Sequence, residues 1–165
     1  MLRTVAVLMC ALLCALWGVK SSLSLKIRRD MLCAVTEGVE RLSVGMEHTN
    51  RPLATLLYGC GHGRAQPLFS AVADNLLCGM GGADAWTEAI GRMPTGLTEE
   101  DIAILTDFSL TLGQSDRRMQ RGNTEMALAS LRAARAEAEN AYATKGRIYS
   151  AMGALLGACV AILLW

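Results

Sequence analysis

The chain has 165 residues and a formal net charge of +1, and 52% of its residues are hydrophobic while only 5% are aromatic. This length allows one domain of modest size once the apolar ends are set aside. With three prolines and no sustained alternation of β-branched residues, the composition excludes a β-sandwich and favours helices rich in Ala, Leu and Met. Basic residues are not interleaved with aromatic ones, so we expect no nucleic-acid partner.

The first element is an apolar segment, residues 4–19, that contains no charged side chain. A membrane-spanning helix needs about 20 mostly apolar residues, and Met1, Leu2 and Leu23 extend this segment toward that length. We therefore predict an N-terminal transmembrane helix over residues 1–19. A cleaved signal peptide is the alternative, although no small-x-small cleavage site follows the apolar residues.

The middle of the chain, residues 20–147, predicts an all-α domain, an antiparallel bundle of about six helices. A long helix over residues 20–48 carries an apolar stripe of Leu25, Leu32, Val35, Val39, Leu42 and Met46. Shorter helices follow over residues 53–57, 67–80, 83–93 and 98–112, separated by turns that contain Gly or Pro. The residues from Thr98 to Asp101 resemble a capping box at the start of the last of these.

The last helix of the body is predicted over residues 116–147, with Ser115 as its N-cap. It is nearly as long as the helix over residues 20–48 at ~1.5 Å per residue, so we expect the two to pair antiparallel. A second uncharged segment, residues 148–165, predicts a C-terminal transmembrane helix. Gly153 and Gly157 form a GxxxG pattern, which favours close packing on the first span or on another subunit of a homo-oligomer.

Basic residues lie on the inner side of both apolar segments. Lys20, Lys26, Arg28 and Arg29 follow the first segment, and Arg132, Arg135, Lys145 and Arg147 precede the second. Positive charge marks the cytoplasmic side of a membrane protein. The pattern therefore predicts a two-pass protein of the cell membrane, with its body in the cytoplasm and both termini outside.

Residues that carry chemistry are sparse in this sequence. Cys60 and His62 have the spacing of two metal ligands, but zinc needs four protein ligands, or three and a water, and no second pair is present. The glycine-rich residues 59–63 lack the Lys-Ser/Thr of a phosphate-binding loop, and a turn is the simpler interpretation. We expect no catalytic residue, no cofactor, no metal and no small-molecule substrate.

The C-terminal third contains a distinctive series of residues: Leu112, Gly113, Ser115, Asp116, Gln120, Lys145, Tyr149 and residues 152–157. Upstream, residues 51–53 form a Pro-Leu turn and Ala85 precedes Trp86. In these residues and in its layout the chain resembles the stage III sporulation protein AB family. In that family Trp86, Leu112, Gly113, Ser115, Asp116 and Gln120 correspond to structural motif positions.

The resemblance implies a non-enzymatic subunit of the sporulation channel complex between mother cell and forespore, in the outer forespore membrane. The family's soluble domain is similar to the cytoplasmic domains of the type II secretion platform protein. The implied role is a platform that links a cytoplasmic ATPase to other membrane subunits of the same complex. The acidic residues Glu99, Glu100 and Asp101 are then candidate docking residues for the ATPase, and helix capping is their alternative role.

Two other functions remain open on the sequence. One is a general type II secretion or pilus platform outside sporulation, which gene neighbourhood would distinguish. The other is a membrane-tethered metal or thiol sensor that uses Cys60 and His62.

Overall fold

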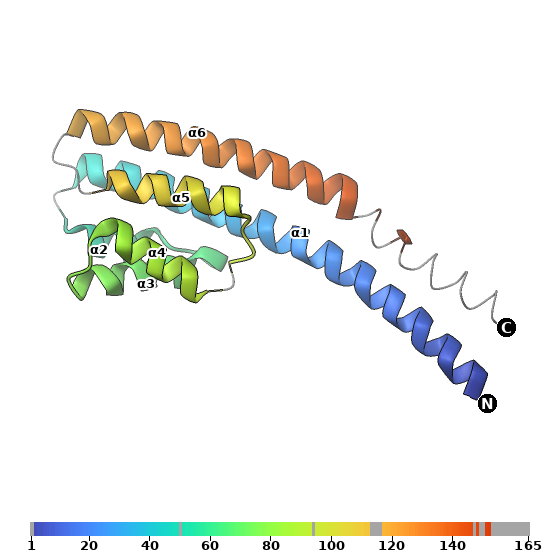
Figure 1. The fold of residues 1–165 in the computed structure, drawn as a ribbon. Coiled ribbons are helices and arrows are strands. Elements are labelled where there is room, and N and C mark those ends of the chain that lie inside the picture. The colour runs from blue at the N-terminus through green and yellow to red at the C-terminus, as the bar shows by residue number, and fades with distance from the viewer. Residues whose placement is uncertain are drawn as a thin grey trace. The chain divides into compact units, whose positions relative to one another are not determined.

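The computed structural model describes residues 2–49, 51–93, 95–112, 117–146, 148 and 151–152, and for residues 2–19, 117–119 and 146 it describes the backbone alone. Every regular element within these ranges is helical (Figure 1). The all-α fold class is therefore confirmed. The chain divides into two compact units, one of residues 30–136 and one of residues 1–29 together with 137–165.

The elements follow the predicted order closely. They are α1 (Leu2–His48), α2 (Leu53–Cys60), the 3-10 turn η1 (Gly63–Ala65), α3 (Gln66–Leu77), α4 (Gly82–Arg92), α5 (Glu99–Thr111), α6 (Arg117–Ala141) and the π turn η2 (Tyr142–Gly146). α2 does not stop before Gly59 as predicted but runs to Cys60. The Cys60 side chain is buried, and this burial holds the extra residues in the last turn of the helix.

α1 carries the predicted apolar stripe, because Leu32, Val35, Val39 and Leu42 are completely buried. Burying each such side chain contributes roughly 1.5–3 kcal/mol, which exceeds differences in helix propensity. The helix is 47 residues long and begins at Leu2. The predicted helix of residues 20–48 is therefore continuous with the helix of the first apolar segment.

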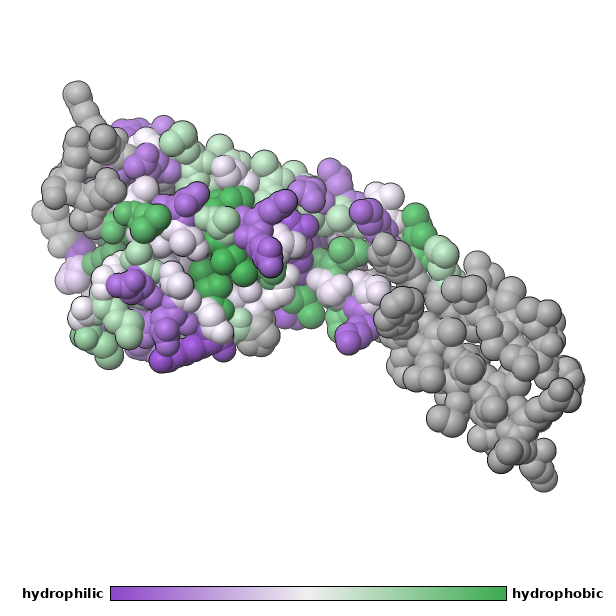
Figure 2. Space-filling view, viewed as in Figure 1, coloured by the Kyte–Doolittle hydropathy of each residue, from purple (hydrophilic) through white to green (hydrophobic). Residues whose placement is uncertain are grey.

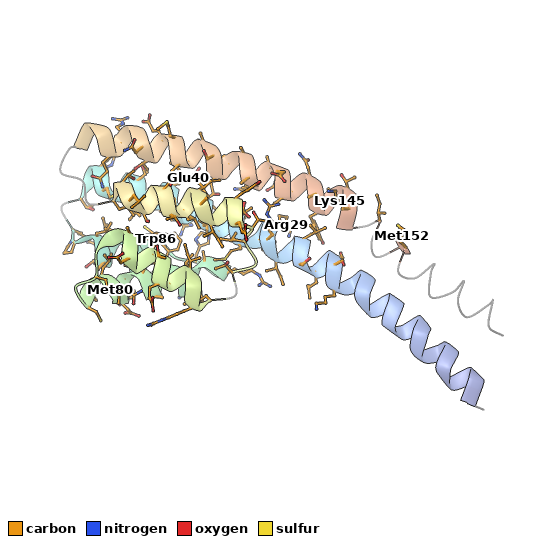
Figure 3. The ribbon with its side chains drawn as sticks, in the orientation of Figure 1. Arg29, Glu40, Met80, Trp86, Lys145 and Met152 are labelled. Carbon is orange, nitrogen blue, oxygen red and sulfur yellow. The ribbon has the colours of Figure 1, made fainter. Side chains whose placement is uncertain are left out.

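Three aromatic side chains form the centre of the unit of residues 30–136. Trp86 of α4 lies edge-to-face between Phe69 of α3, at 5.5 Å between ring centroids, and Phe108 of α5, at 6.1 Å (Figure 3). All three rings are buried. Edge-to-face pairs stabilise by about 0.5–1.5 kcal/mol beyond the area they bury. The aromatic centre therefore fixes α3, α4 and α5 to one another.

The turn between α3 and α4 is a Schellman motif that glycine makes feasible. The Met80 amide donates to the Asn75 carbonyl at 3.1 Å, and the Gly79 amide donates to the Leu76 carbonyl at 3.0 Å. Gly79 has φ of 87°, a conformation that a residue with a Cβ rarely adopts. The buried Asn75 amide donates to the Ala85 carbonyl at 3.1 Å and joins α3 to the first turns of α4.

The unit of residues 1–29 and 137–165 contains a departure from the predicted last helix. The α-helix was expected to reach residue 147, but it ends at Ala141 and the chain continues as the π turn of residues 142–146. The first residue of this turn, Tyr142, lies under the Arg29 guanidinium at 4.5 Å from the ring centroid. Such a contact stabilises by about 0.5–1 kcal/mol at an exposed site and favours the turn that presents the ring.

The structure does not add support for the two expected membrane spans. Across the described part of the chain, none of the helices combines the length and apolar character needed to cross a membrane. Residues 153–165, which include Gly153 and Gly157, lie outside the described residues, and so do the side chains of residues 4–19.

Candidate interaction surface

The first turn of α5 is a capping box, as the sequence predicts. Asp101 donates its backbone amide to the Thr98 hydroxyl at 3.3 Å, and the Asp101 carboxylate accepts from the Thr98 amide at 2.9 Å. Asp101 is only 1% exposed, whereas Glu99 and Glu100 face solvent. The capping box therefore fixes the helix start and leaves two carboxylates on its surface, where the helix dipole favours negative charge.

Acidic residues predominate over the whole stretch from α3 to α5. Residues 65–112 contain seven acidic side chains against one basic side chain, Arg92, which pairs with Glu88 at 2.7 Å. Asp84, Glu99, Glu100 and Asp107 form no ion pair with a residue that the structure describes, and Asp74 accepts a hydrogen bond from the Tyr58 hydroxyl. The unmatched charge on α5, from Glu99, Glu100 and Asp107, favours a positively charged partner at this helix.

A groove of about 280 Å³ lies between α5 and the part of α6 that belongs to the same unit. We call it the α5–α6 groove; it is lined by Ile104, Asp107 and Thr111 of α5 and by Asn123, Met126 and Ala127 of α6. Met126 is 67% exposed, and Leu110, on the solvent side of α5, is 57% exposed. Figure 2 views this face and shows hydrophobic surface over α5 and along α6, interrupted by hydrophilic side chains.

His62 is engaged by a carboxylate. Its Nε2 lies 2.8 Å from Oε2 of Glu37 on α1, and this hydrogen bond lowers the pKa of Glu37. The Cys33 thiol donates to the other oxygen of Glu37 at 3.7 Å. Cys60 is buried, and burial raises the pKa of its thiol, which disfavours the thiolate that metals and electrophiles need.

Within the described residues, His, Cys, Asp and Glu side chains nowhere gather in a group of three or more that could hold a metal ion. The geometry therefore gives the sensor interpretation of Cys60 and His62 no support, because the imidazole is already hydrogen-bonded to Glu37.

The likeness to known proteins extends over nearly the whole chain. The family model described as Stage III sporulation protein AB matches residues 3–165. The chain belongs to the stage III sporulation protein AB family. Stage III sporulation protein AB of Bacillus subtilis (strain 168) is 30% identical over 132 residues, which are 76% of this chain and 77% of that protein. A solved structure of Stage III sporulation protein AB (SpoIIIAB) has a TM-score of 0.65 and 25% identity, covering 71% of this chain and 97% of its own.

The motif residues that carried the resemblance to stage III sporulation protein AB do not form one site within the part of the chain that the structure describes. Trp86 and Leu112 are buried, and their roles are in packing. The Trp86 Nε1 is also buried and has no hydrogen-bond partner among the residues that the structure describes. Gly113, Ser115 and Asp116 lie outside the described residues.

Gln120, the last of the motif residues, lies at a surface depression between α1 and α6. Its Nε2 is 3.6 Å from the sulfur of Met46 on α1. The depression, of about 480 Å³, is also lined by Glu47 and Arg121, which pair at 3.4 Å. Gln120 therefore helps to join the two helices of the stage III sporulation protein AB bundle.

The α5–α6 groove is the feature that the sequence interpretation missed. The stripe that predicts the buried face of α5 includes Leu105, Phe108 and Leu112, all of which are buried. Ile104, which lines the groove, is an apolar residue that lies off that stripe.

Proposed function

We propose that this member of the stage III sporulation protein AB family is a non-enzymatic subunit of the channel complex between mother cell and forespore. Its task is to present a rigid helical body to a cytoplasmic ATPase and to other membrane subunits of the complex. What supports the sporulation role is the family match over residues 3–165. What supports a docking role is a single observation, the fixed start of α5 with the carboxylates of Glu99 and Glu100, which form no ion pair with a described residue.

The proposal places the protein in the outer forespore membrane, with residues 1–19 and 148–165 as spans and residues 20–147 in the cytoplasm. The support is in the sequence, because residues 4–19 and 148–165 are uncharged and basic residues flank them on the inner side. Protease treatment of intact protoplasts tests this topology. Cleavage of the body from outside would reverse the orientation.

Deletion of the gene in a sporulating host tests the role in endospore formation. We expect arrest after engulfment, scored by microscopy and by heat-resistant spore counts, and rescue by the full-length chain. Normal spore yield in the deletion strain would overturn the proposal. A platform for secretion or pili outside sporulation would instead give a defect in growing cells.

Charge reversal tests the docking residues. We expect the double substitution Glu99→Lys and Glu100→Lys to weaken co-purification of the ATPase by about tenfold or more, because both carboxylates are lost from the surface. Asp84→Lys with Glu88→Lys is the matched control, since it changes the net charge equally and also alters the first turns of a helix, α4. Equal binding by both double variants would exclude the start of α5 as the docking point.

A further inference from the structure

The α5–α6 groove has the dimensions of a trough for side chains. Its volume of about 280 Å³ is below the roughly 300–1,000 Å³ that is typical of small-molecule pockets. Its two walls are helices, and the buried Phe108 contributes to its lining. An amphipathic helix laid along such a trough buries apolar residues spaced by three and four positions. The shape therefore fits a partner helix better than a metabolite.

Exposed apolar side chains lie on both helices that form the groove. Met126 is 67% exposed on the α6 wall, and Leu110 is 57% exposed on the solvent side of α5. Single exposed apolar residues are common on soluble proteins, but residues that border an apolar trough mark an interaction site more strongly. A helix that lies in the trough would cover Met126, which lines it.

The two edges of the groove differ in charge. On α5, Glu100, Ala103, Asp107 and Leu110 share one face, because they are spaced by three or four residues. Glu100 and Asp107 form no ion pair with a described residue. On α6, the groove is lined by uncharged side chains, among them Asn123 and Ser130. A helix that matches both edges has Lys or Arg along the side that faces α5.

A second copy of this chain matches the groove poorly. Elsewhere on the described surface, Leu77 and Met80 form an exposed apolar pair at the end of α3, but Asp74 and Asp84 stand close to them in sequence and are exposed too. If that surface of one copy met the groove of another, acidic residues would face Asp107. Like charges across an interface are unfavourable, which argues for a different protein as the partner.

We propose that the α5–α6 groove binds an amphipathic helix of a partner protein, with an apolar stripe in the trough and basic residues against Glu100 and Asp107. The inference rests on the proposed assembly function and names the chemistry of the partner. It also extends the docking surface from the first turn of α5 along the whole helix.

Site-specific photocrosslinking of the full-length chain in a sporulating host tests the groove. The photoreactive residue p-benzoylphenylalanine replaces Met126 in one strain and Leu77 in the control strain, since the two side chains are almost equally exposed, at 67% and 68%. We expect a crosslinked product at position 126 that is absent at position 77. Mass spectrometry of the product should map the partner peptide to a helix with apolar residues three and four apart and with Lys or Arg on one flank.

Second substitutions then test each component of the site. With the photoreactive residue at position 126, Ile104→Glu and Asp107→Lys should each lower the crosslinking yield by about tenfold, because both side chains line the groove. Asp107→Asn, which keeps the side-chain shape, should lower it less. Asp84→Lys is the control and should leave the yield unchanged. Immunoblots establish equal amounts of each variant, so that a folding defect is not scored as lost binding.

Several results would overturn the groove proposal. The first is a crosslinked product at position 126 that is no stronger than at position 77. The second is a crosslinked peptide that comes from a second copy of this chain or that contains no basic residue. The third is a crosslinking yield that does not change with Asp107→Lys. If the deletion strain still arrests in sporulation, such a result removes the groove and leaves the proposed function intact. If the deletion strain sporulates normally while the crosslink forms as described, the proposed function fails and the groove remains.

Discussion

Two regions of the unit of residues 30–136 differ in how they use charge. On α1, each of three glutamates contacts a side chain from another part of the fold. Glu37 is hydrogen-bonded to His62, and Glu40 and Glu47 form ion pairs with Arg132 and Arg121. Figure 3 labels Glu40, which accepts two hydrogen bonds from the Arg132 guanidinium of α6, at 3.0 and 2.7 Å. Acidic residues of α1 are thus matched within the fold.

The stretch from α3 to α5 is the opposite case, since Asp84, Glu99, Glu100 and Asp107 have no such match among the described residues. Like charges that are left together repel one another and slightly destabilise the compact state. A cost of this kind is offset when a partner supplies the opposite charge, which also speeds association and selects the partner. Under the proposed function, α1 and α6 form the support of the body and α5 forms its contact face.

Replacement of Trp86 should have the largest effect on stability, because its ring holds the helices of the acidic stretch together. Trp86→Ala removes the ring between Phe69 and Phe108, and we expect a loss of about 3–5 kcal/mol in the free energy of unfolding. Trp86→Phe should cost much less, because the buried Nε1 has no hydrogen-bond partner among the described residues to lose. Chemical denaturation of the full-length chain measures both variants.

Hydrogen exchange locates the damage in Trp86→Ala. Amides of α3, α4 and α5 should lose more protection from hydrogen exchange than those of residues 30–48 of α1, because the aromatic centre joins α3, α4 and α5. Uniform loss of protection would mean that the contact face and its support are one cooperative unit.

Replacing a glycine by alanine should destabilise the protein at one position in α1 and stabilise it at one position in α6. In α1, a Cβ on Gly38 would lie 2.5 Å from Cζ of Phe69, whose ring is buried and cannot move freely. We expect Gly38→Ala to destabilise by about 1–3 kcal/mol. In α6, a Cβ on Gly122 meets no atom within 4 Å, so Gly122→Ala should stabilise by up to about 1 kcal/mol. Thermal unfolding of the pair checks both signs, and a stabilising Gly38→Ala would contradict the tight packing of α1 on α3.

The next largest effect on stability should come from the N-terminal cap of α5, which fixes the start of the proposed contact face. Thr98→Ala removes the hydroxyl that accepts the Asp101 amide and should cost about 0.5–2 kcal/mol. Glu99→Gln keeps the cap and should cost less than about 1 kcal/mol through the helix dipole alone. Equal losses would show that the charge of the first turn, and not the cap, stabilises this helix start. Denaturant midpoints at two salt concentrations separate the two contributions.

Local sequence patterns predicted the helices well, for identifiable reasons. The stripe of Leu32, Val35, Val39 and Leu42 repeats at steps of three and four, and all four side chains are buried. The capping box of Thr98 and Asp101 is a contact over three residues, which spacing alone can reveal. Helix ends were less predictable: Cys60 extends α2 because its side chain is buried, and burial depends on residues far away in the sequence.

The candidate site was only partly predictable. Glu99 and Glu100 were found because acidic residues at a helix start form a local signal. The α5–α6 groove could not be found, because it depends on which faces of two helices meet. In the same way, the sequence offered Cys60 as the companion of His62, yet His62 pairs with Glu37, 25 residues upstream, which spacing does not reveal.

The ion pair between Glu40 and Arg132 should have a smaller effect than the cap. Both side chains are partly exposed, so a double-mutant cycle with Glu40→Gln and Arg132→Gln should give a coupling of about 0.2–1 kcal/mol. The control is the pair of Glu88 and Arg92 within α4, where about 0.3–0.5 kcal/mol is expected. High salt should reduce both couplings. A coupling near zero for Glu40 and Arg132 would mean that matched charge on α1 sets geometry without adding stability.

The smallest effect should come from Glu37, and it should depend on pH. Its hydrogen bond to His62 lowers the pKa of Glu37 below the ordinary value. A carboxyl with a lowered folded-state pKa contributes stability above its unfolded-state pKa of about 4.3, and this contribution is lost as the pH falls through the lowered value. Wild type should therefore be more stable than Glu37→Gln near neutral pH, and the difference should shrink in the acid range below about pH 4.3.

His62→Gln supplies the control for this prediction. Because His62 is the main cause of the lowered pKa, Glu37→Gln should have little further effect in the His62→Gln background at any pH. Unfolding measured by circular dichroism from pH 3 to pH 7 gives the four curves of the cycle. A Glu37→Gln difference that stays constant over this range would mean that the side chain acts through packing and that its charge is unmatched, like the charges of the acidic residues of α5.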